Sequence, residues 1–77
     1  MTQKEQYLKN KQELAEARRA QKRLERLRAE AQKLEGELEA IEAEMTGNAA
    51  TDYIRLADLD NQKNALEERL LKLYEEI

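Results

Sequence analysis

The chain has 77 residues, a formal net charge of −3 and 40% charged residues, and it contains no Pro, His or Cys. Disulfides and thiolate chemistry are therefore excluded, and a chain of this size is too small for a core with a ligand pocket. No apolar run approaches the ~20 residues that cross a bilayer, and no signal peptide is recognisable, so we expect a cytoplasmic protein without a membrane segment.

The first predicted helix spans about residues 3–45 and carries a narrow apolar stripe along its second half. Spacings of three and four residues alternate along this stripe, which is the a/d pattern of a coiled coil. Its members are Leu24, Leu27, Ala31, Leu34, Leu38, Ile41 and Met45. Such a stripe needs a partner helix to cover it.

The pattern breaks at residues 46–51, where Thr-Gly-Asn-Ala-Ala-Thr predicts a turn. Gly47 is suited to end the first helix, and Thr51 or Asp52 can cap the second, which is predicted over about residues 52–77. The second stripe repeats the spacing of the first and consists of Leu56, Leu59, Lys63, Leu66, Leu70, Leu73 and Ile77.

The two stripes predict an all-α fold, a two-helix antiparallel coiled-coil hairpin that forms a single domain. A turn centred between Asn48 and Ala49 makes the facing layers apolar on both sides. These layers are Ile41 with Leu56, Leu38 with Leu59, Ala31 with Leu66, Leu27 with Leu70, Leu24 with Leu73 and Ala20 with Ile77. Residues 1–19 would extend beyond the second helix as an N-terminal helical overhang.

Flanking charges favour the same register of the two helices. It pairs opposite charges at Glu44 with Arg55, Glu30 with Arg69, Arg23 with Glu76 and Arg28 with Glu67. A slide by one heptad in one direction sets Arg23 against Arg69. A slide in the other sets Glu30 against Glu76 and Glu35 against Glu67, and such like-charge contacts are unfavourable.

A parallel dimer is the alternative assembly, and the sequence disfavours it. Continuing the heptads of the first helix straight through the break would bury Asn48, Asp52 and Arg55. A four-residue shift would be needed to recover the second stripe. We therefore expect a monomer.

Charge is distributed unevenly along the chain. Residues 1–33 contain ten Lys or Arg and five Glu, whereas residues 34–77 contain four Lys or Arg and twelve Asp or Glu. The outward positions of the basic part are candidates for binding nucleic-acid phosphates: Arg18, Arg19, Lys22, Arg26 and Lys33. The alternative is that these cations serve only solubility. Without interleaved aromatic residues, binding would be limited to the nucleic-acid backbone.

Lys63 interrupts the second stripe, where we expect it to face Leu34 and to reach Glu35 or Asp60 with its ammonium group. A lysine at such a position fixes register at some cost in stability, and this structural role is favoured over a catalytic one.

Three other large side chains have expected places. Tyr53 and Ile54 should cover Met45 at the tip of the hairpin, and Tyr74 should pack near Gln21.

Catalytic and metal-binding patterns are absent from the sequence. The two glycines, Gly36 and Gly47, do not form a phosphate-binding loop, and the carboxylates should line a solvated surface instead of a cleft. The sequence predicts neither an enzyme nor a bound cofactor or metal in this chain.

Two segments carry a resemblance to a known family. Residues 50–56, Ala-Thr-Asp-Tyr-Ile-Arg-Leu, and residues 70–76, Leu-Leu-Lys-Leu-Tyr-Glu-Glu, are similar to the tip and the closing segment of the C-terminal coiled-coil domain of bacterial ABC-F proteins. The stretch from Lys22 through Met45 resembles the first helix of that domain, so the resemblance extends over the whole chain. A Trp commonly follows the closing segment, and Ile77 stands there in this chain.

The resemblance implies a fragment of a larger protein, an accessory domain that follows two ATP-binding cassette domains. The ATP, the Mg and the catalysis would belong to those domains of the parent. The implied partners are the parent ATPase domains and DNA, RNA or the ribosome. The rival hypothesis is a purely structural coiled coil, either a spacer or a homodimerisation element.

Overall fold

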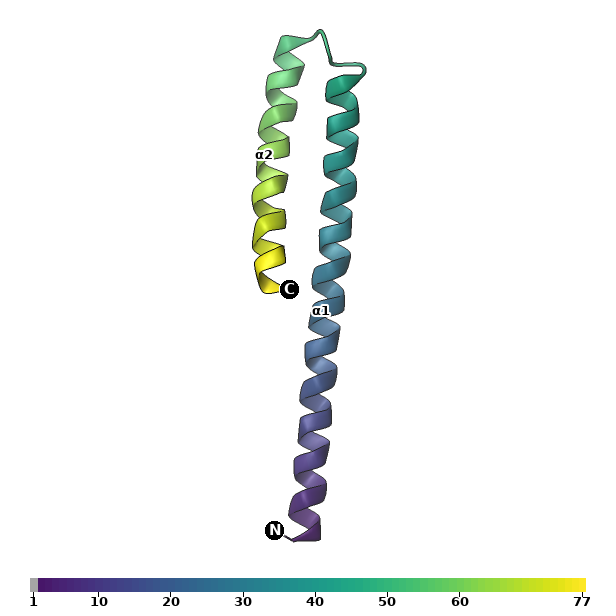
Figure 1. Ribbon diagram of the computed structural model, residues 1–77, viewed down its shortest axis with the longest axis vertical. Coiled ribbons are helices and arrows are strands. Elements are labelled where there is room, and N and C mark those ends of the chain that lie inside the picture. The colour runs from purple at the N-terminus through teal and green to yellow at the C-terminus, as the bar shows by residue number, and fades with distance from the viewer. Residues whose placement is uncertain (1) are drawn as a thin grey trace.

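The computed structural model describes residues 2–77, and these form two antiparallel α-helices joined by a short loop (Figure 1). Helix α1 spans Gln3–Thr46 and helix α2 spans Tyr53–Glu76, each within one residue of the predicted bounds. The molecule is a rod with extents of 73 × 15 × 10 Å. The predicted all-α hairpin with an N-terminal helical overhang is therefore confirmed. Neither helix is long and apolar enough to span a membrane over residues 2–77.

Side-chain caps define the start of each helix. The Thr2 hydroxyl accepts a hydrogen bond from the Glu5 amide at 3.2 Å, and the Glu5 carboxylate accepts one from the Thr2 amide at 3.4 Å. This reciprocal capping box satisfies amides that the first turn leaves unpaired. Asp52 caps α2 as expected, because its carboxylate accepts the Arg55 amide at 3.1 Å.

Gly47 ends α1, but its backbone is not left-handed as such a position often is, because φ is −109°. The loop turns through hydrogen bonds from the amides of Gly47 and Ala49 to the Glu44 carbonyl, at 3.3 and 3.0 Å. Ala49, within this loop, is buried. The expectation that the first residues of α2 cover Met45 is wrong: Tyr53 is 84% exposed and Ile54 is 88% exposed.

The register of the hairpin differs from the predicted one by one heptad. Lys63 Nζ lies 3.6 Å from a Glu42 carboxylate oxygen, about two helical turns beyond the Leu34 that the sequence predicted it would face. The Tyr74 hydroxyl donates a hydrogen bond to Glu35 instead of lying near Gln21. These contacts place α2 about 10 Å closer to the tip of the hairpin than predicted.

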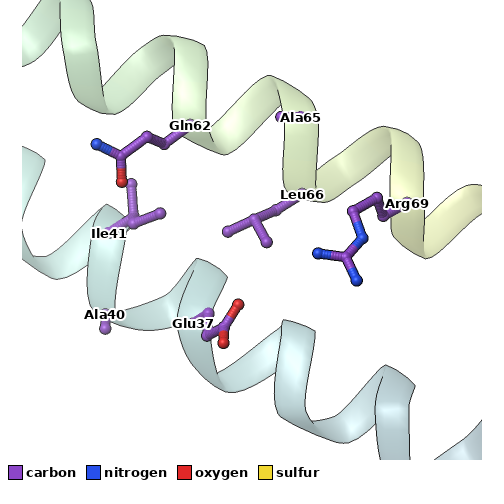
Figure 2. Close-up of a pocket in the computed structure, with 7 residues that line it drawn as sticks. All are labelled: Glu37, Ala40, Ile41, Gln62, Ala65, Leu66 and Arg69. Atoms are coloured by element: carbon purple, nitrogen blue, oxygen red, sulfur yellow. The ribbon is translucent and has the colours of Figure 1, made fainter.

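Close-up geometry agrees with this register. Leu66 of α2 points between Glu37 and Ile41 of α1, and Gln62 lies over Ile41 (Figure 2). The shifted alignment brings Leu34 to Leu70 and Ala31 to Leu73. These four residues form the buried apolar cluster, against which Leu27, Leu38 and Leu66 pack. The predicted seam residues thus do form the core, although with different partners.

The repulsion expected between glutamates on the two helices does not prevent this register, because other side chains contact those glutamates. Glu30 and Glu76 border the same surface depression, where Arg69 lies 3.3 Å from the Glu30 carboxylate. A second depression brings Glu35 and Glu67 together.

Each glutamate of this second pair has a partner of its own. Tyr74 donates to Glu35, and Lys63 Nζ lies 4.0 Å from Glu67, so the ammonium expected to reach Glu35 or Asp60 contacts Glu42 and Glu67 instead. Each repulsive contact is therefore relieved by a third group.

Two of the predicted ion pairs survive the shift because an arginine side chain is long enough to reach diagonally across the seam. Arg55 lies 2.9 Å from Glu44, and Arg69 pairs with Glu30. The hydrogen bond to Glu44 is the main cause of a raised pKa for Arg55, which stays fully charged. The expected pairs of Arg23 with Glu76 and Arg28 with Glu67 are not among the ion pairs of residues 2–77.

The overhang is consequently longer than the predicted residues 1–19, of which Met1 lies outside the described residues. Leu73 packs in the cluster with Ala31, so Ile77, one turn later, comes level with Leu27 and not with Ala20. Figure 1 shows the C-terminus of the chain about midway along α1. About the first half of α1 therefore has no partner helix.

The two glycines provide a matched test of the helix end. At Gly47 an added Cβ would lie 3.0 Å from the Ala43 carbonyl oxygen, a backbone atom that cannot easily move, whereas at Gly36 it would meet nothing within 4 Å. Gly36→Ala should stabilise the hairpin by roughly 0.5–1 kcal/mol through better helix propensity. Gly47→Ala should instead destabilise it by roughly 1 kcal/mol. Thermal unfolding followed by circular dichroism measures both, and an equal stabilisation would contradict this account of the turn.

Replacing the lysine in the seam tests its cost to stability. The side chain of Lys63 is 31% exposed and contacts Glu42 and Glu67 at the surface. Because exposed ion pairs contribute ~0–1 kcal/mol and burying a leucine contributes ~1.5–3 kcal/mol, Lys63→Leu should raise the free energy of unfolding by about 1 kcal/mol. Lys9→Leu, on the exposed overhang, is the control and should have little effect. A clean monomer that loses stability with Lys63→Leu would refute the prediction.

Candidate nucleic-acid interface

The candidate interface lies on α1, in and beside the part that α2 does not cover. All five cations that the sequence nominated are exposed to solvent. We call them the cationic face: Arg18, Arg19, Lys22, Arg26 and Lys33. The structure places each of them on one continuous helix, so their relative positions are fixed by helical geometry.

Helical periodicity brings these five cations to one side of α1. At about 100° per residue they fall within an arc of about 100°, and Arg18 and Lys33 are about 22 Å apart along the axis. The seam residues Leu27 and Ala31 project towards the other side of the helix. The cationic face therefore remains accessible where α2 is present and where it is absent.

No carboxylate pairs with the cationic face within residues 2–77. The cations that form ion pairs are Arg55, Lys63 and Arg69, all on α2. Arg19, Lys22 and Arg26 border one shallow depression over Ala29, together with Arg23 and Glu25. Four cations around one glutamate leave an excess of positive charge there, which an external anion would neutralise.

Sequence reasoning missed two further residues, Arg23 and Arg28. Both were assigned to ion pairs with α2, but both are exposed, and their expected partners Glu76 and Glu67 lie elsewhere in the observed register. Whether the two arginines are free of partners depends on the register of the helices. The sequence does not determine this register, because the apolar layers match again after a shift of one heptad. The two arginines extend the cationic surface to both flanks of the seam of α1, Arg23 beyond the end of α2 and Arg28 level with its last turn.

The end of α2 that faces this region is acidic. Its last turn contains no basic residue, and Glu76 lies beside Glu30 of α1. Tyr74, whose hydroxyl donates a hydrogen bond to Glu35, borders a surface depression with Leu71. This hydrogen bond, together with desolvation, raises the pKa of Tyr74.

The hairpin has one other groove of note, drawn in Figure 2. The small side chains of Ala40 and Ala65 leave space between the helices, and Glu37, Gln62 and Arg69 border it. These polar groups do not converge on a common point, as a nucleophile and its base would have to. Among residues 2–77 no group of His, Cys, Asp or Glu is arranged to hold a metal ion.

Comparison with known proteins adds no assignment: no family model matches the chain, and neither a curated protein nor a solved structure matches it significantly.

The Tyr74 hydrogen bond yields a prediction that also reports on register. In a chain with Tyr7→Phe and Tyr53→Phe, only Tyr74 contributes to the phenolate absorbance. Glu35→Gln should then lower the pKa of Tyr74 towards its ordinary value, whereas Glu37→Gln should not. Because folding raises the pKa of Tyr74, the bond stabilises the hairpin below about pH 10 and ceases to do so as the phenol ionises. An identical titration in the two glutamine variants would show that Tyr74 does not contact Glu35.

Proposed function

We propose that this chain is a non-catalytic accessory domain that binds the phosphate backbone of DNA or RNA, including ribosomal RNA, through the cationic face. The observation that supports this function is the gathering of five exposed cations on one side of α1, without a carboxylate partner in residues 2–77. Backbone phosphates are the ligands that such a linear array of Lys and Arg suits best.

The chemistry of the surface limits what it can recognise. A cationic helix without aromatic side chains can neutralise phosphates but offers no platform for stacking bases. Binding by so few cations should be sequence-tolerant and weak, in the range of roughly 10⁻⁴–10⁻⁶ M for the isolated chain. Such affinity fits a domain that supplements the binding of a larger protein.

The parent protein in this proposal is a bacterial ABC-F ATPase, with this domain at its C-terminal end. The resemblance of residues 50–56 and 70–76 to that family supports the assignment. The ATP and Mg would be bound by the other domains of the parent, in a cytoplasmic and monomeric protein.

A structural role is the second candidate. The buried side chains of the hairpin are all apolar and none is polar or charged among the described residues, as expected of a coiled-coil spacer. In that case the cationic face would serve solubility or dock onto an acidic surface of the parent, and a homodimerisation element would be the other form of this role.

Charge reversal separates the two functions. Arg19→Glu with Arg26→Glu should weaken binding to a fluorescein-labelled DNA or RNA duplex by at least tenfold without loss of helicity. Lys9→Glu with Lys72→Glu changes the net charge equally outside the cationic face and is the control. For the unmodified chain, log affinity should fall with log salt at a slope of about −0.9 per neutralised phosphate. If the unmodified chain binds neither duplex at low salt, the spacer role is favoured.

A further inference from the structure

Arg23 lies just beyond the end of α2 and Arg28 lies level with its last turn, on opposite flanks of the seam of α1. Both side chains are exposed, and neither has an ion-pair partner within residues 2–77. They sit within the basic stretch that also contains Lys22 and Arg26, and Arg23 borders the same depression as these two. In this register, therefore, the two arginines extend the cationic face around the helix.

The seam would also close in a second register. Sliding α2 by one heptad towards the N-terminus of α1 again sets leucine against leucine, for example Leu70 against Leu27 in place of Leu34. The half of α1 that α2 does not cover leaves room for this movement. In Figure 1 α2 begins beyond the end of α1, so the loop at residues 47–52 can accommodate the slide without stretching.

The two registers exchange one set of surface contacts for another. The observed register has Lys63 with Glu42 and Tyr74 with Glu35, and it brings Glu30 beside Glu76. The slid register would give these up for two arginine pairs, Arg23 with Glu76 and Arg28 with Glu67. Because individual surface pairs are weak, neither set imposes a large preference.

We propose that Arg23 and Arg28 contact phosphates and that the register of the hairpin controls their availability. This inference rests on the proposed function. In the observed register the two arginines are free to bind the nucleic-acid backbone. In the slid register Glu76 and Glu67 occupy them, and only the cationic face remains. A polyanion therefore favours the observed register, because it binds that state with two additional cations.

Engineered disulfides can hold each register, since the chain has no cysteine of its own. Leu34→Cys with Leu70→Cys joins facing positions of the observed register, and Leu27→Cys with Leu70→Cys joins those of the slid one. The two target positions on α1 are about 10 Å apart along the helix, whereas disulfide-linked Cα atoms lie within about 7 Å. Each pair therefore oxidises in one register only.

Binding of the fluorescein-labelled DNA duplex to the two locked forms is the decisive measurement. The observed-register lock should bind at least as tightly as the reduced protein, which also populates the slid register. The slid lock should bind roughly tenfold more weakly, and its salt slope should be smaller by about 1.8, corresponding to two lost phosphate contacts. Arg23→Gln with Arg28→Gln should weaken the observed-register lock to the same extent and leave the slid lock unchanged. Circular dichroism checks that each locked form remains helical.

The outcomes distinguish the inference from the function on which it rests. Equal affinity and equal salt slope for the two locks would overturn register control while the proposed function stands. Failure of the slid-register double variant to oxidise, when the observed-register double variant oxidises fully, would show that the slid register is not reached and would also overturn it. If neither the locked nor the reduced protein binds the DNA duplex or the corresponding RNA duplex at low salt, the proposed function itself fails. The extent of oxidation would still report the register in that case.

Discussion

Packing of the leucine seam of α2 against that of α1 is the interaction on which the rest of this molecule depends. Residues 2–77 contain one buried apolar cluster, built around Leu34 and Leu70, and the chain has no cysteine that could cross-link the helices. The seam repeats every seven residues on both helices, and this repeat admits more than one alignment. All contacts between the helices, including every ion pair across them, follow from the alignment that is adopted.

Features set by local sequence could be predicted well. The bounds of both helices, the cap at Asp52 and the break at Gly47 depend on residues within one or two turns, and the structure confirms each of them. The seam residues were also identified, because a three-four spacing is a property of a single helix. The ammonium group of Lys63 reaches carboxylates as expected, but they belong to Glu42 and Glu67 and not to Glu35 or Asp60.

The register could not be predicted from the same information. The apolar layers match equally well after a slide of one heptad. The register therefore depends on surface ion pairs, each of which contributes little to stability. Comparing charges in pairs predicts that Glu35 and Glu67 repel each other. It does not reveal that Tyr74 contacts Glu35 and that Lys63 contacts Glu67. The residues of the candidate interface show the same difference between local features and features that depend on the register. The outward cations follow from helical periodicity, whereas the state of Arg23 and Arg28 depends on the register.

Continuity of α1 gives the molecule a mechanical property as well. The helix runs without a break from its cap at Thr2 to Gly47, so the cationic segment and the hairpin tip belong to one stiff body 73 Å long. A body of that kind acts as a lever. A small tilt where the cations are held would swing the exposed Tyr53 and Ile54 through a much larger distance, and leverage of this sort can carry an event at one end to a partner at the other.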